Sequence, residues 1–364
     1  MTYNSIDLFS GGGGLSEGMR QAGFNINAAV EIDPVAAETF KVNHKDAVVI
    51  ERDIQYVSSS ELLKQCGLAK GKLDLLAGCP PCQGFSSLTA KYKRNDKRNS
   101  LIKEVSRLVK EILPRAVMIE NVPGLMKKGH THLSDFINDL ESLGYIINYG
   151  VLQVADYGVP QERRRFVLLA GLGFEIKIPE PTHSKTGENG LLQWKTVRDA
   201  LGGLGRPVPL SEAASYGGPR SLNWNITRTL SKLNIERLKH VKPGGPRYDI
   251  PDHLRPKCHQ GNNSGFGNVY GRMNFDSPSP TITGGCTVLS KGRFGHPTEL
   301  RTISVREAAR LQTFPDSFEF ASESVDQVCQ IIGNALPCEF ARVMSLACYR
   351  ELSKQDSNTH ITEN

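Results

Sequence analysis

The first 170 residues alternate between short apolar runs and segments with helical periodicity. Strands are expected at residues 6–9, 28–30, 47–50, 73–77 and 116–119. Helices are expected between them, among others at residues 15–22, 35–43 and 101–113. Strands that alternate with helices form a mostly parallel sheet, and such sheets bind ligands beyond the carboxyl ends of their strands. The sequence therefore predicts an α/β fold with its site at those strand ends.

The middle of the 364-residue chain has a different composition. Residues 171–300 hold 19 of the 35 glycines and 12 of the 20 prolines, which disfavours long regular elements. They also hold 17 Lys and Arg against 10 Asp and Glu, a net charge of +7 within a total of +6, which favours a polyanionic partner. Helical periodicity returns after residue 300. We therefore expect residues 1–175 and 301–364 to form one domain, interrupted by a basic, loop-rich domain over residues 176–300.

A glycine-rich segment at residues 11–14 follows the first predicted strand. It would let a ligand approach the backbone at the N-terminus of the next helix. Glu31 comes 20 residues after Gly11, at a strand end where an acidic residue usually holds a ribose hydroxyl. The G-x-G-x-x-G spacing is missing, which favours a neutral or cationic nucleoside over a nicotinamide cofactor. Asp53 would either cap the next turn or bind an adenine amine; a tight turn without a ligand is the alternative for the whole segment.

A C-x-x-C motif stands directly after the fourth predicted strand. Cys79 and Cys82 would fit a redox dithiol or half of a zinc site. A zinc site needs two more ligands, and the sequence has no second C-x-x-C and no H-x-x-x-H. A redox pair would stand nearer the first strand of a thioredoxin-like unit. A single nucleophilic thiolate at Cys82, beside the nucleoside pocket, explains the segment better, so we expect no metal.

Charged residues stand at two further strand ends. Glu120 ends the fifth predicted strand, where its carboxyl group would face the same cleft as Cys82 and, when buried, donate a proton. The alternative is a carboxylate that caps the next segment. Further along, a period of two puts Gln161, Arg163 and Arg165 on one face. The two arginines would stabilise a thiolate or bind phosphate, unless the run is only a solvated face.

Together these segments resemble the motifs of the DNA (cytosine-5) methyltransferase family. The resemblance covers residues 7–14, Pro81-Cys82-Gln83, Glu120-Asn121-Val122 and the run of Gln161, Arg163 and Arg165. It extends to a helix-and-turn segment at residues 301–315 and to Gly333-Asn334-Ala335-Leu336-Pro337. The six motifs stand in the family's order and span nearly the whole chain.

The resemblance implies a fold and a methyl donor. The fold is that of the S-adenosylmethionine-dependent methyltransferases, a Rossmann-like, mostly parallel seven-stranded sheet with a smaller, loop-rich target-recognition domain. The donor is S-adenosylmethionine, with no metal. The positions that match the family's cofactor site are Phe9, Gly11, Gly14, Leu15, Glu31, Ile32, Asp53, Ile54, Pro81, Leu101, Asn334 and Ala335. Glu31 would bind the ribose, Asp53 the adenine and Asn334 the amino-acid end.

The implied reaction methylates carbon 5 of a cytosine within a specific double-stranded DNA sequence. Cys82 would add to carbon 6 while Glu120 donates a proton to ring nitrogen 3, and Arg165, supported by Arg163, would favour the thiolate. The cytosine must first be flipped out of the duplex. Lys and Arg of residues 171–300 would mostly contact phosphates. The positions expected to contact DNA are Gln83, Ser86, Thr281 and Thr283.

Partners and location follow from the same resemblance and from composition. We expect a monomer that binds double-stranded DNA, with a cognate restriction endonuclease as a further partner. The apolar run at residues 166–174 is shorter than the roughly 18 residues of a membrane span, so no membrane is expected. Scattered cysteines and the missing leader pattern favour the cytoplasm. The compact chain, in which we expect no regulatory domain, favours a bacterial or archaeal source. The alternatives are an RNA (tRNA) cytosine-5 methyltransferase of the same superfamily and an inactive DNA-binding module.

Overall fold

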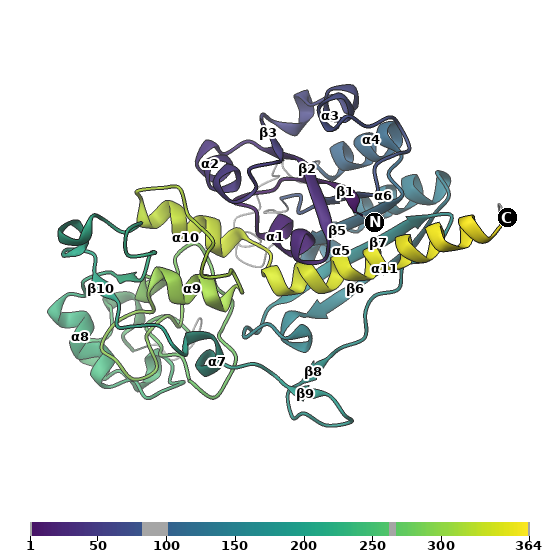
Figure 1. Cartoon of the computed structure of the whole chain (residues 1–364). Coiled ribbons are helices and arrows are strands. Elements are labelled where there is room, and N and C mark those ends of the chain that lie inside the picture. The colour runs from purple at the N-terminus through teal and green to yellow at the C-terminus, as the bar shows by residue number, and fades with distance from the viewer. Residues whose placement is uncertain (1, 82–100, 262–266, 363–364) are drawn as a thin grey trace. The chain divides into compact units, whose positions relative to one another are not determined.

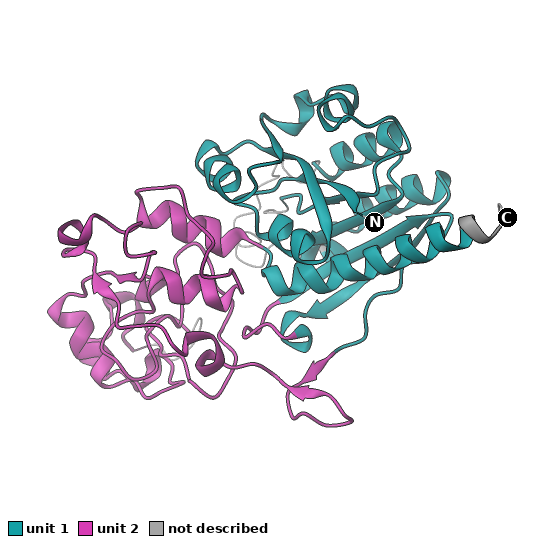
Figure 2. Cartoon of the chain, in the orientation of Figure 1, with its two compact units in different colours: residues 1–157, 164–181, 336–364 teal, residues 158–163, 182–335 magenta. Residues whose placement is uncertain are grey.

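The computed structural model describes residues 2–81, 101–261 and 267–362, and the chain divides into two compact units (Figure 2). Unit 1 consists of residues 1–157, 164–181 and 336–364. Unit 2 consists of residues 158–163 and 182–335. The chain therefore leaves unit 1 twice and returns to it twice.

Unit 1 is built on a seven-stranded sheet with the order β3-β2-β1-β4-β5-β7-β6 (Figure 1). The strands are β1 (Tyr3–Leu8), β2 (Phe24–Glu31), β3 (Val48–Glu51), β4 (Leu75–Gly78), β5 (Ala116–Asn121), β6 (Tyr145–Gln153) and β7 (Arg164–Leu172). Neighbouring strands are parallel except that β7 runs antiparallel to both β5 and β6. This confirms the predicted mostly parallel sheet, in which the carboxyl ends of β1 to β5 meet at one edge.

Helices cover both faces of this sheet (Figure 1). On one face, α1 (Gly14–Gln21) packs against α11 (Cys338–Thr362), which also contacts β5. On the other face, α4 (Ile102–Ile112) packs between α3 (Ser59–Cys66) and α6 (His130–Ser142). Among the described residues, the unit also contains the helical segments α2 (Pro34–Asn43), α5 (Gly124–Lys128), η1 (Ile54–Tyr56) and η5 (Val154–Tyr157).

Local sequence explains where these helices form. The buried face of α4 consists of Ile102, Val105, Ser106, Leu108, Val109 and Ile112, at the helical spacing that the sequence predicts. The Asp33 carboxylate caps α2, and Pro34 takes the first helical position, where its missing N–H does no harm. Gly18 lets α1 approach α11 closely, because a Cβ at this position would lie 2.4 Å from the Cβ of Ala341.

Unit 2 consists of short elements joined by long loops. Its strands are β8 (His183–Ser184), β9 (Leu192–Gln193), β10 (Val208–Pro209) and β11 (Ile226–Thr227). Its helices are α7 (Val197–Leu201), α8 (Lys232–Lys239), α9 (Val305–Leu311) and α10 (Val325–Asn334), with 3-10 turns η6 (Ala213–Tyr216), η7 (Arg247–Asp249), η8 (Asp252–Leu254), η9 (Lys257–His259) and η10 (Leu289–Lys291). The unit is therefore loop-rich, as its glycine and proline content predicts.

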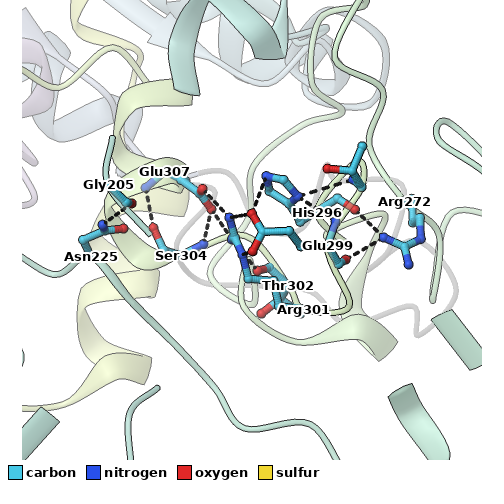
Figure 3. A network of polar contacts seen from close by, with 10 residues as sticks. Gly205, Asn225, Arg272, His296, Glu299, Arg301, Thr302, Ser304 and Glu307 are labelled. Carbon is cyan, nitrogen blue, oxygen red and sulfur yellow. Dashed lines mark hydrogen bonds and ion pairs between the residues drawn. The ribbon is translucent and has the colours of Figure 1, made fainter. Parts of the chain in front are cut away.

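Buried polar side chains tie the loops of unit 2 together (Figure 3). The guanidinium group of Arg272 donates hydrogen bonds of 2.6–3.2 Å to three backbone carbonyl groups, one at the end of α8 and two in a loop. These carbonyl groups belong to Leu238, His296 and Glu299. Arg301 forms a bidentate pair with Glu307 at 2.7 and 2.9 Å. Side chains thus satisfy backbone groups that no sheet or helix pairs in this unit.

Residues 301–335 belong to unit 2, whereas the sequence analysis placed them in the returning segment of the large domain. The reason lies in α9, where buried Arg306 donates to the carbonyl oxygens of Asn223 and Phe318 at 2.9 Å each. The chain rejoins unit 1 only at Leu336. An apolar periodicity predicts a helix, but it does not show which unit the helix packs against.

The stretch Val325–Asn358 contains a window of 18 residues that is long and apolar enough to cross a membrane. It contains α10 and most of α11, which residues 335–337 separate. In the structure, 61% of that window is buried inside the protein. Burial of this extent is what a core helix shows, so the apolar composition is explained by packing.

Candidate active site

A cavity of about 330 Å³ lies at the carboxyl ends of β1, β2 and β3 in unit 1. Its volume is within the range of about 300–1,000 Å³ that is typical of small-molecule sites. The cavity is lined by Phe9, Val30, Glu31, Ile32, Arg52, Asp53, Ile54, Gln55, Pro81 and Leu101. Seven of these residues are among the positions expected to contact the cofactor: Phe9, Glu31, Ile32, Asp53, Ile54, Pro81 and Leu101. The structure therefore brings these seven side chains together around one cavity.

Glu31 fixes the glycine-rich loop to the end of β2. One oxygen of its carboxylate accepts a hydrogen bond of 2.7 Å from the Gly11 N–H. The other accepts from the N–H groups of Ile32 and Asp33, at 2.9 and 2.8 Å. Burial raises the pKa of Glu31, and these N–H groups oppose the rise. The carboxylate is thus held in one orientation on the wall of the cavity.

The glycine-rich loop leads directly into the N-terminus of α1, which begins at Gly14. Gly13 has a φ of +96°, and a Cβ there would lie 2.8 Å from the His44 ring nitrogen. Glycine is therefore required both by backbone conformation and by space. Beneath the loop, the Asp7 carboxylate accepts from the Ser16 hydroxyl at 2.7 Å, and burial raises its pKa to about 7.

The end of β3 supplies a second acidic residue to the cavity. Asp53 caps η1, because its carboxylate accepts from the Gln55 N–H at 3.1 Å. It therefore caps a turn and also lines the cavity, so the two interpretations of this residue are compatible. Sequence reasoning missed Val30, Arg52 and Gln55 as lining residues. The signal for them was position, since each stands next to a residue singled out at the end of β2 or β3.

An ion pair stands at the carboxyl end of β5. The Arg165 Nε atom, on the neighbouring strand β7, lies 2.6 Å from a Glu120 carboxylate oxygen. Both side chains are mostly buried, with 13% and 12% exposed. Burial lowers the pKa of Arg165, and the negative charge of Glu120 opposes this. Leu15, Gly78 and Met118 are among the residues around Glu120.

Asn121 connects the end of β5 to the segment that leads into the predicted nucleophile. Its side-chain NH₂ donates to the Pro80 carbonyl oxygen at 3.0 Å, and its side-chain oxygen accepts from the Val122 N–H at 2.7 Å. Cys82 itself, with Gln83 and Ser86, lies outside the described residues. Burial raises the pKa of the Cys79 thiol well above its usual value, and the charges of Glu120 and Asp7 raise it further. Cys79 is therefore a neutral thiol, unsuited to nucleophilic attack.

Gln161 and Arg163 belong to unit 2, whereas Arg165 belongs to β7 of unit 1. Arg163 is buried, and its guanidinium group donates to the carbonyl oxygens of Ile282 and Gly333 at 3.0 and 3.3 Å. The period of two across these positions therefore does not describe one strand, because β7 begins at Arg164. The described contacts of Arg163 are structural ones within unit 2.

Thr281 and Thr283 are exposed on either side of buried Ile282 in unit 2. The Thr281 hydroxyl donates to the Glu162 carbonyl oxygen at 3.0 Å. Asn334 is the last residue of α10, with an exposed side chain, and Ala335 follows it. Residues 2–81, 101–261 and 267–362 hold no group of three or more His, Cys, Asp or Glu that could bind a metal ion.

Comparisons with known proteins were made for the whole chain. The model of the family described as C-5 cytosine-specific DNA methylase matches residues 3–350. Type II methylase M.HgiDII of Herpetosiphon aurantiacus is 39% identical over 355 residues, which cover 95% of this chain and 95% of that protein. Type II methyltransferase M1.HphI of Haemophilus parahaemolyticus is 37% identical over 354 residues, covering 95% and 87%. A crystal structure described as a DNA modification methyltransferase encoded within an E. coli prophage has a TM-score of 0.74 and 26% identity, covering 96% of this chain and 99% of that one.

Proposed function

Because the chain belongs to the C-5 cytosine-specific DNA methylase family, we propose that it methylates carbon 5 of one cytosine within a specific double-stranded DNA sequence. The chain is a DNA (cytosine-5) methyltransferase. Our proposal goes beyond this family assignment in three respects: the site of the methyl donor, the two reacting side chains and the double-stranded form of the DNA. The observation that carries this assignment is one sheet edge in unit 1. The cavity at the ends of β1 to β3 and the Glu120–Arg165 pair at the ends of β5 and β7 lie along it.

S-adenosylmethionine fits the cavity by size and by chemistry. The volume of about 330 Å³ suits a nucleoside with a short side chain. Glu31, held by three backbone N–H groups, would accept from the ribose hydroxyls. Asp53 and Ile54 would contact the adenine, and Phe9, Ile32, Pro81 and Leu101 would supply the apolar wall. When bound, the donor supplies a methyl group on a positively charged sulfur.

Gly11, Gly14 and Leu15 would contact the donor from the loop and the first turn of α1. Asn334 and Ala335, by resemblance, would contact its amino-acid end. The N–H groups at the start of α1 attract a negatively charged group, so the carboxylate of the donor would suit a position beside Gly14 and Leu15.

Cys82 would act as the nucleophile and Glu120 as the acid. Cys82 would add as a thiolate to carbon 6 of cytosine while protonated Glu120 donates a proton to ring nitrogen 3, which makes carbon 5 nucleophilic. After carbon 5 has taken the methyl group, a base would remove its proton and Cys82 would leave by elimination. The Asn121 bond to Pro80 supports this assignment, because it fixes the start of the Cys82 segment to the end of the Glu120 strand. Arg165, 2.6 Å from Glu120, would favour the thiolate.

DNA would contact both units. The cytosine would be flipped out of the duplex, since carbon 6 cannot be reached inside it. Gln83 and Ser86 would hold the flipped nucleotide, and exposed Thr281 and Thr283 its neighbouring backbone. Exposed Lys and Arg of unit 2 would bind phosphates in a salt-dependent way. By resemblance, the chain would act in the cytoplasm as a monomer. Relatives named Type II methylase and Type II methyltransferase support a further partner, a restriction endonuclease that acts on the same site.

Bisulfite sequencing tests the proposed reaction. DNA from bacteria that express the chain should carry 5-methylcytosine at every copy of one short sequence and nowhere else. Purified protein should transfer labelled methyl groups from S-adenosylmethionine to duplex DNA, and not to tRNA offered at the same concentration. If tRNA were labelled and DNA stayed unmethylated, the DNA assignment would be overturned. If neither nucleic acid were labelled, the methyltransferase activity itself would be overturned.

A further inference from the structure

We propose that Gln161 and Gln312 form a buried amide relay that couples DNA binding at Thr281 and Thr283 to donor binding at Asn334. The turn that carries Thr281 and Thr283 is distant in sequence from Asn334 at the end of α10, and both belong to unit 2. The ligands of these two segments, DNA and the methyl donor, are those of the proposed function, on which this coupling rests. The relay itself is built from hydrogen bonds inside unit 2.

The two amides are arranged head to tail. The Gln161 NH₂ donates to the Gln312 side-chain oxygen at 2.6 Å. The Gln161 oxygen accepts from the Ile282 N–H at 3.0 Å. At the other end, the Gln312 NH₂ donates to the carbonyl oxygens of Ile332 and Ala335 at 2.6 and 3.1 Å. A backbone donor at one end and backbone acceptors at the other allow only this orientation of both amides.

One end of the relay holds the turn that carries the two exposed threonines. Ile282 stands between them, and its N–H is the group that Gln161 accepts from. The Ile282 carbonyl oxygen accepts from Arg163 at 3.0 Å, so both backbone polar groups of this residue are fixed. Thr281 is held in addition through the Glu162 carbonyl oxygen.

The other end of the relay holds the last turn of α10. The two carbonyl groups that accept from Gln312 flank Asn334 on both sides. Gly333 packs directly on the threonine turn, because a Cβ there would lie 2.2 Å from the Thr283 carbonyl carbon and the Gly284 nitrogen. A displacement of either segment must therefore move the other or break a buried hydrogen bond.

Burial makes such a break unfavourable. Gln161 and Gln312 are both 0% exposed, so water does not replace a lost partner. When one ligand displaces its segment, the relay displaces the other segment with it, so the second ligand binds with less cost of rearrangement. By thermodynamic linkage, DNA must then raise donor affinity by the same factor by which the donor raises DNA affinity.

The test measures this factor. Donor affinity is determined by calorimetry with S-adenosylhomocysteine, in the absence and presence of a duplex that carries the sequence found by bisulfite sequencing. We expect DNA to raise the affinity of the wild type by about fivefold or more. Gln161→Glu keeps the acceptor for Ile282 but sets a carboxylate oxygen against the Gln312 oxygen, so the factor should fall to about one. Lowering the pH from about 8 to about 6 should restore it in part, because a protonated acid can donate again.

Gln327→Glu is the matched control. Gln327 is exposed on α10, and its side chain accepts from Ser322, so the same change of charge leaves the relay intact and should leave the factor unchanged. If Gln161→Glu does not fold, Gln161→Met with Gln312→Met removes both amides at nearly constant volume and should likewise abolish coupling. A wild type that methylates DNA without coupling, or relay variants that keep it, would overturn the relay and leave the methyltransferase assignment standing. Absence of methylation by the wild type would instead overturn the proposed function.

Discussion

Units 1 and 2 provide hydrogen-bond partners for their buried backbone N–H and C=O groups in two different ways. In unit 1 the strands and helices pair their own N–H and C=O groups, and apolar side chains fill the spaces between them. In unit 2 the loops depend on side chains, and buried arginines such as Arg272 and Arg306 each donate to several loop carbonyl groups. A regular fold satisfies its backbone locally, whereas an irregular one needs long, charged side chains to do so.

This difference adds a second role for part of the basic charge. The sequence analysis assigned the Lys and Arg of residues 171–300 mostly to DNA phosphates. Arg247 and Arg272 are buried, at 2% and 4% exposed, and therefore cannot reach a phosphate without unfolding the loops around them. Part of the positive charge of unit 2 stabilises its own loops, and only the exposed part is left for DNA.

The largest expected effect is a loss of methyl transfer without a change in the structure of either unit. Cys82→Ser should abolish methyl transfer, because a hydroxyl is a far weaker nucleophile than a thiolate. Donor affinity and the hydrogen exchange of both units should stay at wild-type values. The matched control is Cys79→Ser, whose neutral thiol should be dispensable. Transfer assays with labelled donor would contradict this assignment if Cys82→Ser turned over normally or Cys79→Ser did not.

The next effect tests the dependence of unit 2 on buried arginine. Arg306→Met removes the donors to the carbonyl oxygens of Asn223 and Phe318 and should destabilise the unit by about 3 kcal/mol. Leu108→Ala in α4 should destabilise unit 1 by about 2–5 kcal/mol through a cavity.

Hydrogen exchange resolved by segment would show whether each change is confined to its own unit. The control is Arg198→Met, because Arg198 is an exposed arginine of unit 2 whose loss should change stability by less than about 1 kcal/mol. An equal effect of Arg198→Met and Arg306→Met would remove the distinction between the units.

A smaller effect concerns the cavity of unit 1. Glu31→Gln should weaken donor binding by about 10- to 100-fold, because an amide offers the ribose one acceptor instead of two and a carboxylate bonds more strongly. Glu38→Gln, an exposed carboxylate on α2, should bind the donor as the wild type does. Calorimetric titration compares the two, and equal affinities would exclude Glu31 from the site.

The smallest effects are opposite dependences of stability on pH. Asp7 has a pKa raised to about 7 by burial, so between about pH 4 and 7 the unfolded chain releases a proton that the folded chain keeps. The contribution of Asp7 to the stability of unit 1 is therefore lost as the pH rises. His296 has a pKa lowered by burial and by the charge of Arg301, so below about pH 6.5 the unfolded chain binds the extra proton. The contribution of His296 to the stability of unit 2 is therefore lost as the pH falls.

Asp7→Asn and His296→Gln isolate these two contributions from other titrating groups, such as His44, whose pKa burial also lowers. Hydrogen exchange, corrected for its intrinsic pH dependence, should show unit 1 of Asp7→Asn losing less stability between pH 4 and 7 than the wild type. It should show unit 2 of His296→Gln losing less stability below about pH 6.5. Parallel pH profiles of mutant and wild type would refute either assignment.

The sequence predicted the sheet of unit 1 because local patterns determine it. The apolar runs at β1 to β5 and the periodicity of α4 can be read from a few neighbouring residues, and seven cavity residues followed from the strand ends. The contacts of Arg163 and Gln161 could not be predicted in this way. Their partners Ile282 and Gln312 stand more than one hundred residues further along the chain, and no periodicity links such pairs.

The close approach of Gly18 in α1 to Ala341 in α11 has a consequence for biosynthesis. During translation, α11 leaves the ribosome after every segment of unit 2. Until then, the face of the sheet that α11 covers, including Met118 beside Ser345, is without this cover. The loops of unit 2 can therefore assemble before α11 covers the sheet, and unit 1 is completed last.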